Sequence, residues 1–262
     1  MCMILPRVFF ALGFASVFQG VQAAEKQVSP AANEPPVLLL SQPLALQPGV
    51  TNKLSIRGLR LKGVTNIQFT GLSAPLEGKL GKIEDSKVPD GASAKSAGDQ
   101  QVEVDVLLPE NAPLGTNVTV LATSLAGTSK ALPLLVIAAA SLLEEKEPNG
   151  GFKEAQELQS GQTVRGSLGD GADVDVFKIA GRAGQMLRAE VIAARLNSTL
   201  DSALTLYDAK GMILGSNDDG AGRDSILTQK LPADGAYFLV LTSVNEKPAK
   251  THLYALKLTL EP

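Results

Sequence analysis

The chain of 262 residues has one cysteine, Cys2, one histidine, His252, and no tryptophan. One thiol and one imidazole make a disulfide framework, a cysteine–histidine zinc site or a Ser-His-Asp triad very hard to assemble. Lys and Arg number 24 against 27 Asp and Glu, a net charge of −3, whereas nucleic-acid binders need clustered basic residues. Aromatic residues make up only 4% of the chain, but 44% of residues are hydrophobic, enough for sizeable cores. The composition favours a non-catalytic, β-rich protein of one or two domains that binds no nucleic acid.

The first 24 residues have the layout of a secretory signal peptide. Arg7 gives a positive start, an apolar run follows from Val8 to Phe18, and Ala23 and Ala24 offer a cleavage site. The run is shorter than the roughly 20 residues of a membrane span, so we expect no span after cleavage. The sequence therefore predicts a signal peptide over residues 1–24 and a secreted, periplasmic or cell-surface protein.

A polar leader and a first β-rich domain follow. Residues 25–36 contain three prolines and are predicted to be disordered. Residues 37–140 alternate polar and apolar side chains in short segments separated by Gly and Pro, the pattern of half-buried strands and turns. Their spacing predicts an immunoglobulin-like β-sandwich, in which residues 85–100 form a long mobile loop. The clearest strand segments are Lys53–Arg57, Val102–Val106, Asn117–Val120 and Leu134–Ala138.

Residues 141–262 are predicted to form a second sandwich, of jelly-roll character, so the fold class is all-β with two β-sandwich domains. Residues 138–147 could begin as a short helix, but Pro148-Asn149-Gly150-Gly151 stops regular structure. Residues 152–158 are expected to add one or two helical turns. Seven or eight short strands in about 120 residues then suggest a jelly roll. The expected strands are Thr163–Leu168, Val174–Ala180, Met186–Ala194, Ala203–Tyr207, Ile226–Leu231, Ala236–Leu241 and Leu253–Leu260.

Oxygen-bearing side chains gather at the joint between the two domains. Pro148 disfavours helix at the preceding residue, so Glu145, Glu147 and Asn149 alternate onto one side of an extended chain. A calcium ion needs six to eight oxygens, more than this segment provides. The loop at residues 169–175 could add oxygens, with its two aspartates at the head of a strand, Asp173 and Asp175, facing the same way. The spacing fits a cation site and a merely solvated linker and turn equally well.

The chain from Glu145 to its C-terminus resembles the bacterial pre-peptidase C-terminal domain family, which includes collagenase collagen-binding modules. The resemblance implies a secreted jelly-roll sandwich that is commonly appended to peptidases and is not itself catalytic. The residues that carry it are Glu145–Asn149, Gly166–Leu168, Asp173–Phe177, Asn217–Gly220, Asp224–Ser225 and Gly235–Val240. The first half resembles, more loosely, immunoglobulin-like domains of bacterial surface proteins, through Pro48-Gly49, Leu54–Gly58 and Pro113–Gly115.

The resemblance also implies a set of metal ligands. In calcium-binding members the ion lies between the N-terminal linker and an acidic loop. The matching positions here are Glu145, Glu147 and Asn149 in the linker and Asp170 and Asp173 in the loop, and Asp175 matches an aspartate frequent in the family. The chain departs from the pattern at Gly150, where such members tend to carry another acidic residue, and its acidic loop is short.

Two further features are given structural interpretations. Residues 217–224 lack the alternating carboxylates and the closing Glu of an EF-hand, so we interpret them as a surface turn. His252 shares a strand face with Tyr254 and Leu256 and is interpreted as a packed histidine, not a ligand.

The sequence thus predicts a secreted protein that binds or scaffolds and does not catalyse, with calcium as the candidate cofactor. Its expected partner is an unknown extracellular protein or polysaccharide, or a secreted peptidase. Two alternatives stay open: a carbohydrate-binding module, whose sign would be an exposed aromatic strip, and a hydrolase with an acidic active site.

Overall fold

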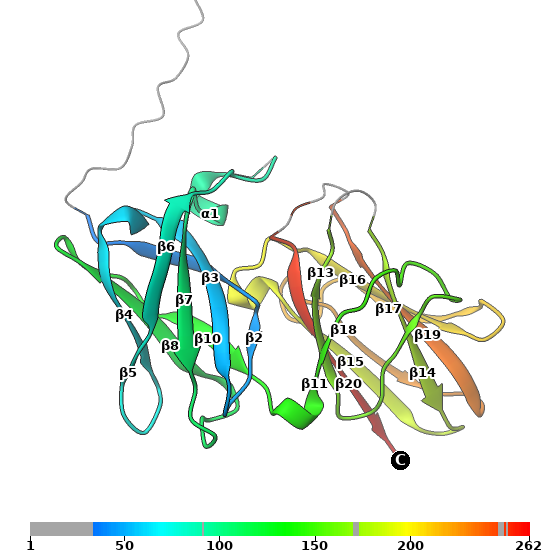
Figure 1. Cartoon of the computed structure of the whole chain (residues 1–262). Helices are drawn as coiled ribbons and strands as arrows, with labels where there is room; N and C mark the ends of the chain where they lie inside the picture. The colour runs from blue at the N-terminus through cyan, green and yellow to red at the C-terminus, as the bar shows by residue number, and fades with distance from the viewer. Residues whose placement is uncertain (1–33, 91, 170–172, 246–248, 250) are drawn as a thin grey trace, which may run out of the picture. The chain divides into compact units, whose positions relative to one another are not determined.

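The computed structural model describes residues 34–262 apart from residues 91, 170–172, 246–248 and 250 (Figure 1). The predicted signal peptide, residues 25–33 of the predicted leader, and Asp170 lie outside the described residues. The residues that the structure describes belong to one compact unit. Within the described part, no helix has both the length and the apolar character needed to cross a membrane.

The first part of this unit is an immunoglobulin-like sandwich. Its strands are β1 (Val37–Gln42), β2 (Ala45–Leu46), β3 (Thr51–Leu59), β4 (Val64–Thr70), β5 (Leu76–Glu77), β6 (Lys79–Asp85), β7 (Gln100–Leu107), β8 (Gly115–Ser124), β9 (Gly127–Thr128) and β10 (Leu132–Val136). One sheet has the order β1-β3-β7-β6; the other has the order β2-β10-β8-β4-β5, with β9 paired to β8. These orders reproduce the ABED and GFC sheets of immunoglobulin domains, which confirms the predicted architecture.

The second part is a jelly roll. Its strands are β11 (Leu142–Glu144), β12 (Gln156–Glu157), β13 (Thr163–Ser167), β14 (Asp175–Gly181), β15 (Met186–Ile192), β16 (Ser202–Asp208), β17 (Ile213–Asn217), β18 (Ile226–Lys230), β19 (Gly235–Ser243) and β20 (Leu253–Glu261). The sheets run β11-β13-β20-β15-β18 and β12-β14-β19-β16-β17. When the short edge strands β11 and β12 are left out, β13 to β20 can be numbered from 1 to 8 in chain order. The two sheets then have the strand orders 1-8-3-6 and 2-7-4-5. This is the connectivity of a jelly roll, and it confirms the prediction.

Alternating side chains build the two cores. In β7, Val102, Val104 and Val106 are at most 2% exposed, whereas Glu103 between them faces solvent. The same alternation runs along β19, where Leu239 and Leu241 are buried. Each sandwich has a large buried apolar cluster of its own, and a third, smaller cluster draws residues from strands of both, such as Leu135 and Leu253.

A long loop joins β6 to β7, at the residues where one was expected. Strand β6 extends to Asp85, β7 begins at Gln100, and a helical turn, α1 (Ala94–Ala97), lies between them. Ser93 caps this turn with its side chain, accepting a hydrogen bond from the backbone N–H of Ser96. Arg57 on β3 donates to the carbonyl oxygens at 97 and 98, at 2.7 and 2.9 Å, and so ties the loop to the sheet.

Near the joint, a single 3-10 turn and two short strands stand where helical segments were expected. Residues 139–141 form a single 3-10 turn, η2 (Ala139–Ser141), and the chain then enters β11. Residues 152–158 form a turn and strand β12, not helix. Tertiary pairing overrides the local preference here, because β11 pairs in parallel with β13 and β12 pairs in parallel with β14. Two further 3-10 turns lie elsewhere, η1 (Leu61–Gly63) and η3 (Ala194–Leu196).

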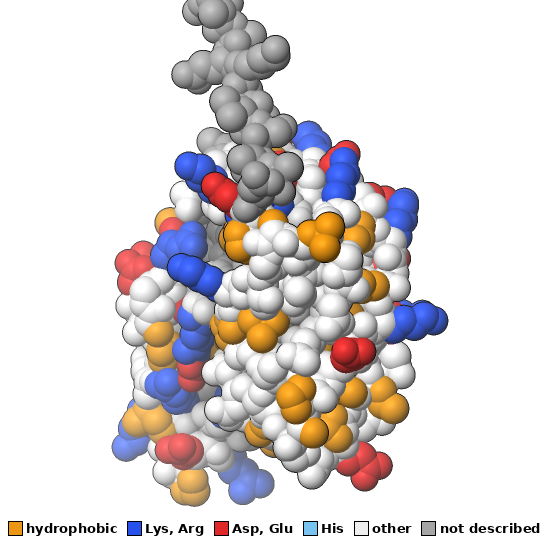
Figure 2. Space-filling model, turned by 90° about the vertical axis from the view of Figure 1, so that its left-hand side faces the viewer, with side chains coloured by type: hydrophobic (Ala, Val, Ile, Leu, Met, Phe, Trp, Pro, Cys, Tyr) orange, Lys and Arg blue, Asp and Glu red, His pale blue; other side chains and the backbone are white. Residues whose placement is uncertain are grey.

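Charges of both signs are mixed on the surface. On the face shown in Figure 2, basic and acidic side chains alternate around the rim, and the centre carries apolar and uncharged polar side chains. Among the described residues on this face, no basic field gathers of the kind that binds a phosphate backbone. This agrees with the slightly acidic net charge.

Candidate metal centre

Three carboxylates converge where the linker meets the head of β14. Glu145, Glu147 and Asp175 each offer one oxygen, and these oxygens lie within 4.8 Å of one another. Residues 145–149, here called the tether, continue from β11, and Asp175 is the first residue of β14. The backbone carbonyl of Asn149 accepts a hydrogen bond from the N–H of Val176 at 3.0 Å, which fastens the end of the tether to β14.

The Glu145 carboxylate is oriented by donors from three directions. Its Oε2 accepts from the backbone N–H of Ser167 at 2.8 Å, and its Oε1 accepts from the Tyr254 hydroxyl at 3.1 Å. The Asn149 amide lies 3.5 Å from the same Oε1. Gly166 makes room for this arrangement, because a side-chain carbon there would lie 2.7 Å from the Tyr254 hydroxyl and collide with the Glu145 carboxylate.

Asp175 and Asn149 bring unsatisfied acceptors into the same place. Both residues are 0% exposed. Neither carboxylate oxygen of Asp175 has a hydrogen-bond partner, and neither does Oδ1 of Asn149. A buried acceptor without a donor costs about 1–3 kcal/mol, and more if it is charged. The two unpartnered oxygens of Asp175, beside the carboxylates of Glu145 and Glu147, are the strongest indication in the described structure that a positive charge belongs at this place.

Burial changes the protonation of this cluster. Burial first, then the neighbouring Glu145 carboxylate, and to a smaller extent Asp173, together raise the pKa of Asp175 from 3.8 to about 9. The Tyr254 hydroxyl opposes the shift, and burial lifts the pKa of Tyr254 itself well above its ordinary value. Without a cation, Asp175 therefore holds a proton at neutral pH.

Glu147 lies on the open side of the cluster. Its side chain is exposed, and its Oε2 accepts the backbone N–H of Asn149 at 2.9 Å, which bends the tether back toward the site. The centre is thus closed on its inner side by Asp175 and open to solvent at Glu147.

The predicted ligand positions fall into three groups. Glu145, Glu147 and Asp175 come together, and Asn149 lies beside them with its buried oxygen. Asp173 is not part of the converging group; its Oδ2 accepts the backbone N–H of Gly169 at 2.5 Å. Asp170 lies outside the described residues.

Sequence reasoning missed Tyr254 as part of the centre. Tyr254 is a fully buried residue of β20, and its alternation with leucines resembles that of any core aromatic. Nothing in the local pattern of the chain indicates that its hydroxyl meets Glu145, which lies 109 positions away in the sequence.

The other acidic candidates have ordinary structural roles. Asp224 is 0% exposed, but its oxygens accept the backbone N–H groups of Ala193 and Ala194 at 3.2 and 2.6 Å and pair with Arg195 at 3.2 Å. Its charge is therefore satisfied, unlike that of Asp175. His252 is 6% exposed, and burial lowers its pKa, with Arg223 adding to the effect.

Comparison with known proteins adds one sequence relative. No family model matches the chain. A stretch of 102 residues, 38% of the chain, is 43% identical to a Deinococcus radiodurans protein named probable subtilase-type serine protease. The chain spans only 14% of the length of that relative.

Several solved structures are similar. The pre-peptidase C-terminal domain of a Bacillus anthracis collagenase is 16% identical, covering 45% of this chain and 100% of its own, with a TM-score of 0.33. The periplasmic inhibitor of g-type lysozyme PliG from Aeromonas hydrophila is 15% identical, covering 46% and 96%, with a TM-score of 0.31. A β-sandwich carbohydrate-binding module is 10% identical, covering 88% and 99%, with a TM-score of 0.24.

The resemblance to pre-peptidase C-terminal domains that the sequence predicts is confirmed as a resemblance, because such a domain is among the similar structures. With TM-scores below 0.5, the structural likenesses carry no argument about ligand or activity. The fold rests on the strand order described above.

Proposed function

We propose that the C-terminal sandwich is a non-catalytic calcium-binding module, in which a cation pins the tether to the head of β14. The observation that carries the proposal is the Asp175 carboxylate, fully buried with both oxygens unpartnered beside two further carboxylates. Glu145, Glu147 and Asp175, with Oδ1 of Asn149, would hold the ion. Bound there, a cation supplies positive charge to oxygens that otherwise repel one another.

The chemistry of the donors favours calcium over a transition metal. All are carboxylate or amide oxygens, the ligands of hard cations, whereas zinc prefers the nitrogen of histidine and the sulfur of cysteine. The only histidine of the chain, His252, is not among the donors. The open side at Glu147 leaves room for water molecules to complete a coordination number of six to eight.

The proposed consequence is mechanical. A cation shared by the tether and β14 would stiffen the joint that precedes the jelly roll and protect it from proteolysis. The chain would then act outside the cytoplasm as a binding or scaffolding protein. Its identity to part of a probable subtilase-type protease supports a secreted peptidase as the proposed partner.

Burial favours this interpretation over a hydrolase with an acidic active site. An acid–base pair must reach its substrate, and Asp175 is 0% exposed. A carbohydrate-binding module would present open aromatic faces to sugar rings. In the jelly roll, the ring of Phe152 lies flat on the ring of Phe238, with centroids 4.3 Å apart and an interplanar angle of 3°. Phe152 therefore covers this face of Phe238.

Thermal melting with calcium and with a chelator tests the proposal. For an affinity near 10⁻⁴ M, in the range of extracellular modules, 10 mM calcium should stabilise the fold by about 2.7 kcal/mol. We expect the melting temperature to rise by roughly 5–10 °C relative to chelator. Terbium is a second probe, because Tyr254 contacts Glu145 and should sensitise its luminescence. An unchanged melting temperature at this calcium concentration would refute the proposal.

A substitution at Gly166 should disturb the same site indirectly. Gly166→Ala places a methyl group against the Glu145 carboxylate and the Tyr254 hydroxyl, so we expect calcium affinity to fall about tenfold. The overpacking should also cost about 1–3 kcal/mol of stability. Gly63→Ala is the control, since a side-chain carbon there meets only Ser124, at 3.8 Å. If calorimetry gave Gly166→Ala and Gly63→Ala the same calcium affinity, the Glu145 carboxylate would not need the space that Gly166 leaves.

A further inference from the structure

Residues 150–157, here called the clasp, fold back from the tether and lie along the edge of β14. Phe152 of the clasp stacks on Phe238 of β19, and its ring meets the edge of Tyr207 of β16 at a centroid distance of 5.4 Å and an angle of 62°. Phe238 and Tyr207 are cross-strand partners, so Phe152 bridges two neighbouring strands. Phe152 is 39% exposed and lies outside the buried core cluster of the jelly roll.

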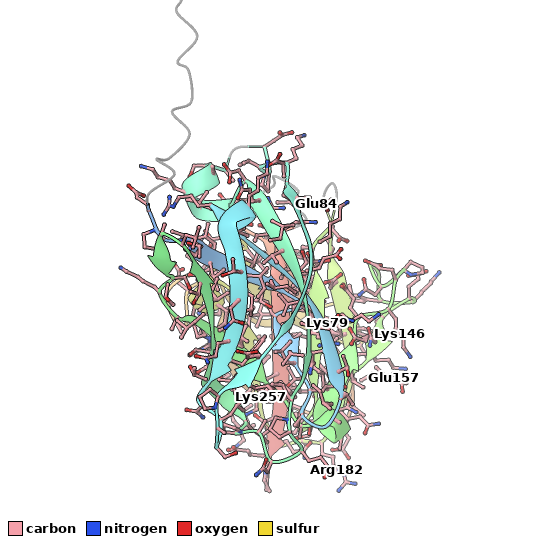
Figure 3. The ribbon with its side chains drawn as sticks, turned by 60° about the vertical axis from the view of Figure 1, so that its left-hand side comes forward. Lys79, Glu84, Lys146, Glu157, Arg182 and Lys257 are labelled. Carbon is pink, nitrogen blue, oxygen red and sulfur yellow. The ribbon has the colours of Figure 1, made fainter. Side chains whose placement is uncertain are left out.

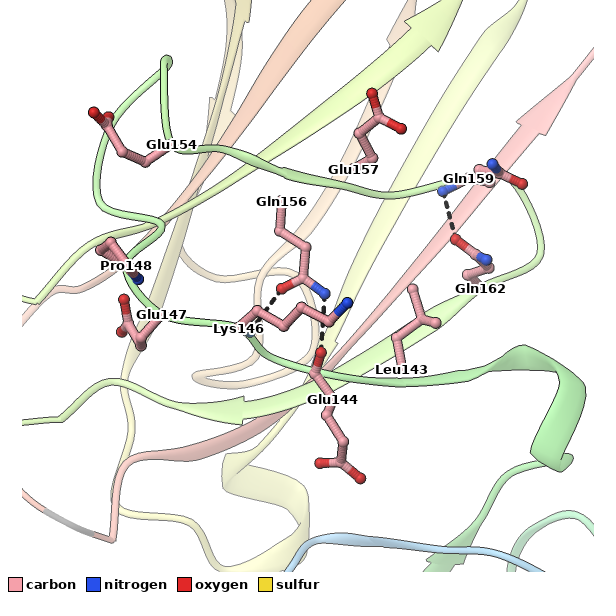
Figure 4. Close-up of a pocket in the computed structure, with 10 residues that line it drawn as sticks. All are labelled: Leu143, Glu144, Lys146, Glu147, Pro148, Glu154, Gln156, Glu157, Gln159 and Gln162. Carbon is pink, nitrogen blue, oxygen red and sulfur yellow. Dashed lines mark hydrogen bonds between the residues drawn. The ribbon is translucent and has the colours of Figure 1, made fainter.

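A single side-chain amide holds the tether from the other end of the clasp. Gln156 donates from Nε2 to the backbone carbonyl of Glu144 and accepts at Oε1 from the backbone N–H of Lys146, both at 2.9 Å (Figure 4). These two groups flank Glu145, the residue whose carboxylate enters the metal centre. The amide thus pairs with the open edge of the tether as the peptide group of a neighbouring strand would.

The clasp is itself anchored to the sheet. Gln156 pairs with Phe177 of β14, and the N–H of Leu158 donates to the carbonyl of Lys178 at 2.9 Å. The neighbouring Glu157 adds an exposed ion pair with Lys178 of β14, at 3.9 Å. Lys146 and Glu157 are exposed and project from the edge of the sandwich (Figure 3).

We propose that Gln156 and Phe152 are positioning residues that hold the tether in its cation-binding conformation before any cation arrives. This inference rests on the proposed calcium site and names the residues that preorganise it. A site whose ligands are already in place avoids the entropic cost of ordering them on binding, so loosening the clasp should weaken binding without touching a ligand.

Calcium titration of the full chain by calorimetry tests the amide. We expect Gln156→Ala to bind calcium about tenfold more weakly, because two backbone hydrogen bonds beside Glu145 are lost. Gln156→Glu keeps the hydrogen-bond acceptor but loses the donor. Its calcium affinity should therefore lie between those of the natural chain and Gln156→Ala, about threefold weaker than that of the natural chain. Gln159→Ala is the matched control, an exposed glutamine of the same groove three residues further on, and should bind normally.

The aromatic anchor is tested in the same way. Phe152→Ala should weaken calcium binding about fivefold, and Phe152→Tyr, which retains the stacked ring, should restore it. Leu125→Ala is the control for removing an exposed apolar side chain, since Leu125 is fully exposed in the other sandwich. In chelator, all these variants should melt within about 2 °C of the natural chain, because neither anchor belongs to a core cluster.

A measurement without metal separates the inference from the proposed function. In chelator, the Lys146 amide should exchange slowly with solvent in the natural chain and at least about tenfold faster in Gln156→Ala. If the natural chain binds calcium and Gln156→Ala binds it equally well, the clasp is refuted and the metal site stands. If the Lys146 amide exchanges freely in the natural chain, the clasp is refuted whatever calcium does. If the natural chain fails to bind calcium, the proposed function itself is wrong.

Discussion

Replacing Asp175 with asparagine should weaken calcium binding at least about 100-fold and, at the same time, make the metal-free protein more stable. Asparagine keeps the shape of the side chain but removes the charge that calcium would neutralise. It also removes the cost of carrying a proton on Asp175 at neutral pH, which follows from a pKa near 9 in the folded protein. We expect this gain to be on the order of 2 kcal/mol in free energy of unfolding at pH 7.

The matched control is another fully buried aspartate. Asp224 accepts backbone N–H groups and pairs with Arg195, so Asp224→Asn should destabilise the sandwich and leave calcium affinity unchanged. Titration calorimetry measures the calcium affinity of Asp175→Asn and Asp224→Asn, and thermal melting in chelator measures the stability of their metal-free folds. If Asp175→Asn bound calcium like the natural chain, or destabilised the metal-free fold as Asp224→Asn does, Asp175 would be an ordinary core residue.

Calcium affinity should rise steeply with pH, by about tenfold per unit between pH 6 and 9, because binding displaces the proton of Asp175. The pKa of Asp175 is raised to about 9 by burial and by Glu145, and Asp173 adds to the shift while Tyr254 opposes it. Glu147 also faces the centre. Calorimetry in two buffers of different ionisation enthalpy should report about one proton released per calcium bound at pH 7.

The metal-free protein should show the opposite trend. In the folded state Asp175 holds its proton up to about pH 9, whereas the unfolded chain loses it near the ordinary value of 3.8. The contribution of this group to stability is therefore greatest below about pH 4 and declines as the pH rises toward 9. Saturating calcium should flatten the decline, and so should Asp175→Asn. Calcium binding without proton release would show that Asp175 is already ionised and would contradict its assigned pKa.

Local patterns were sufficient to predict the architecture. Alternating residues in β7 and β19 mark one buried and one more exposed side, and this period survives in any sheet that buries one face. Two of the strands that were not named, β6 and β17, lack such a pattern. Strand β6 carries mostly exposed or half-exposed residues, and β17 buries no residue fully. Their place in the sheets depends on pairing with β7 and β16, which the local sequence does not encode.

What the sequence by itself determined is therefore the two-sandwich fold class and the acidic character of the tether, because both follow from the order of side chains along an extended chain. Only the tertiary structure decided that Asp175 is buried beside Glu145 and Glu147, that Asp173 accepts the backbone N–H of Gly169 and that the Tyr254 hydroxyl meets Glu145. Desolvation and hydrogen bonding between β14, β20 and the tether arise from contacts between residues far apart in the chain, and no local pattern reports them.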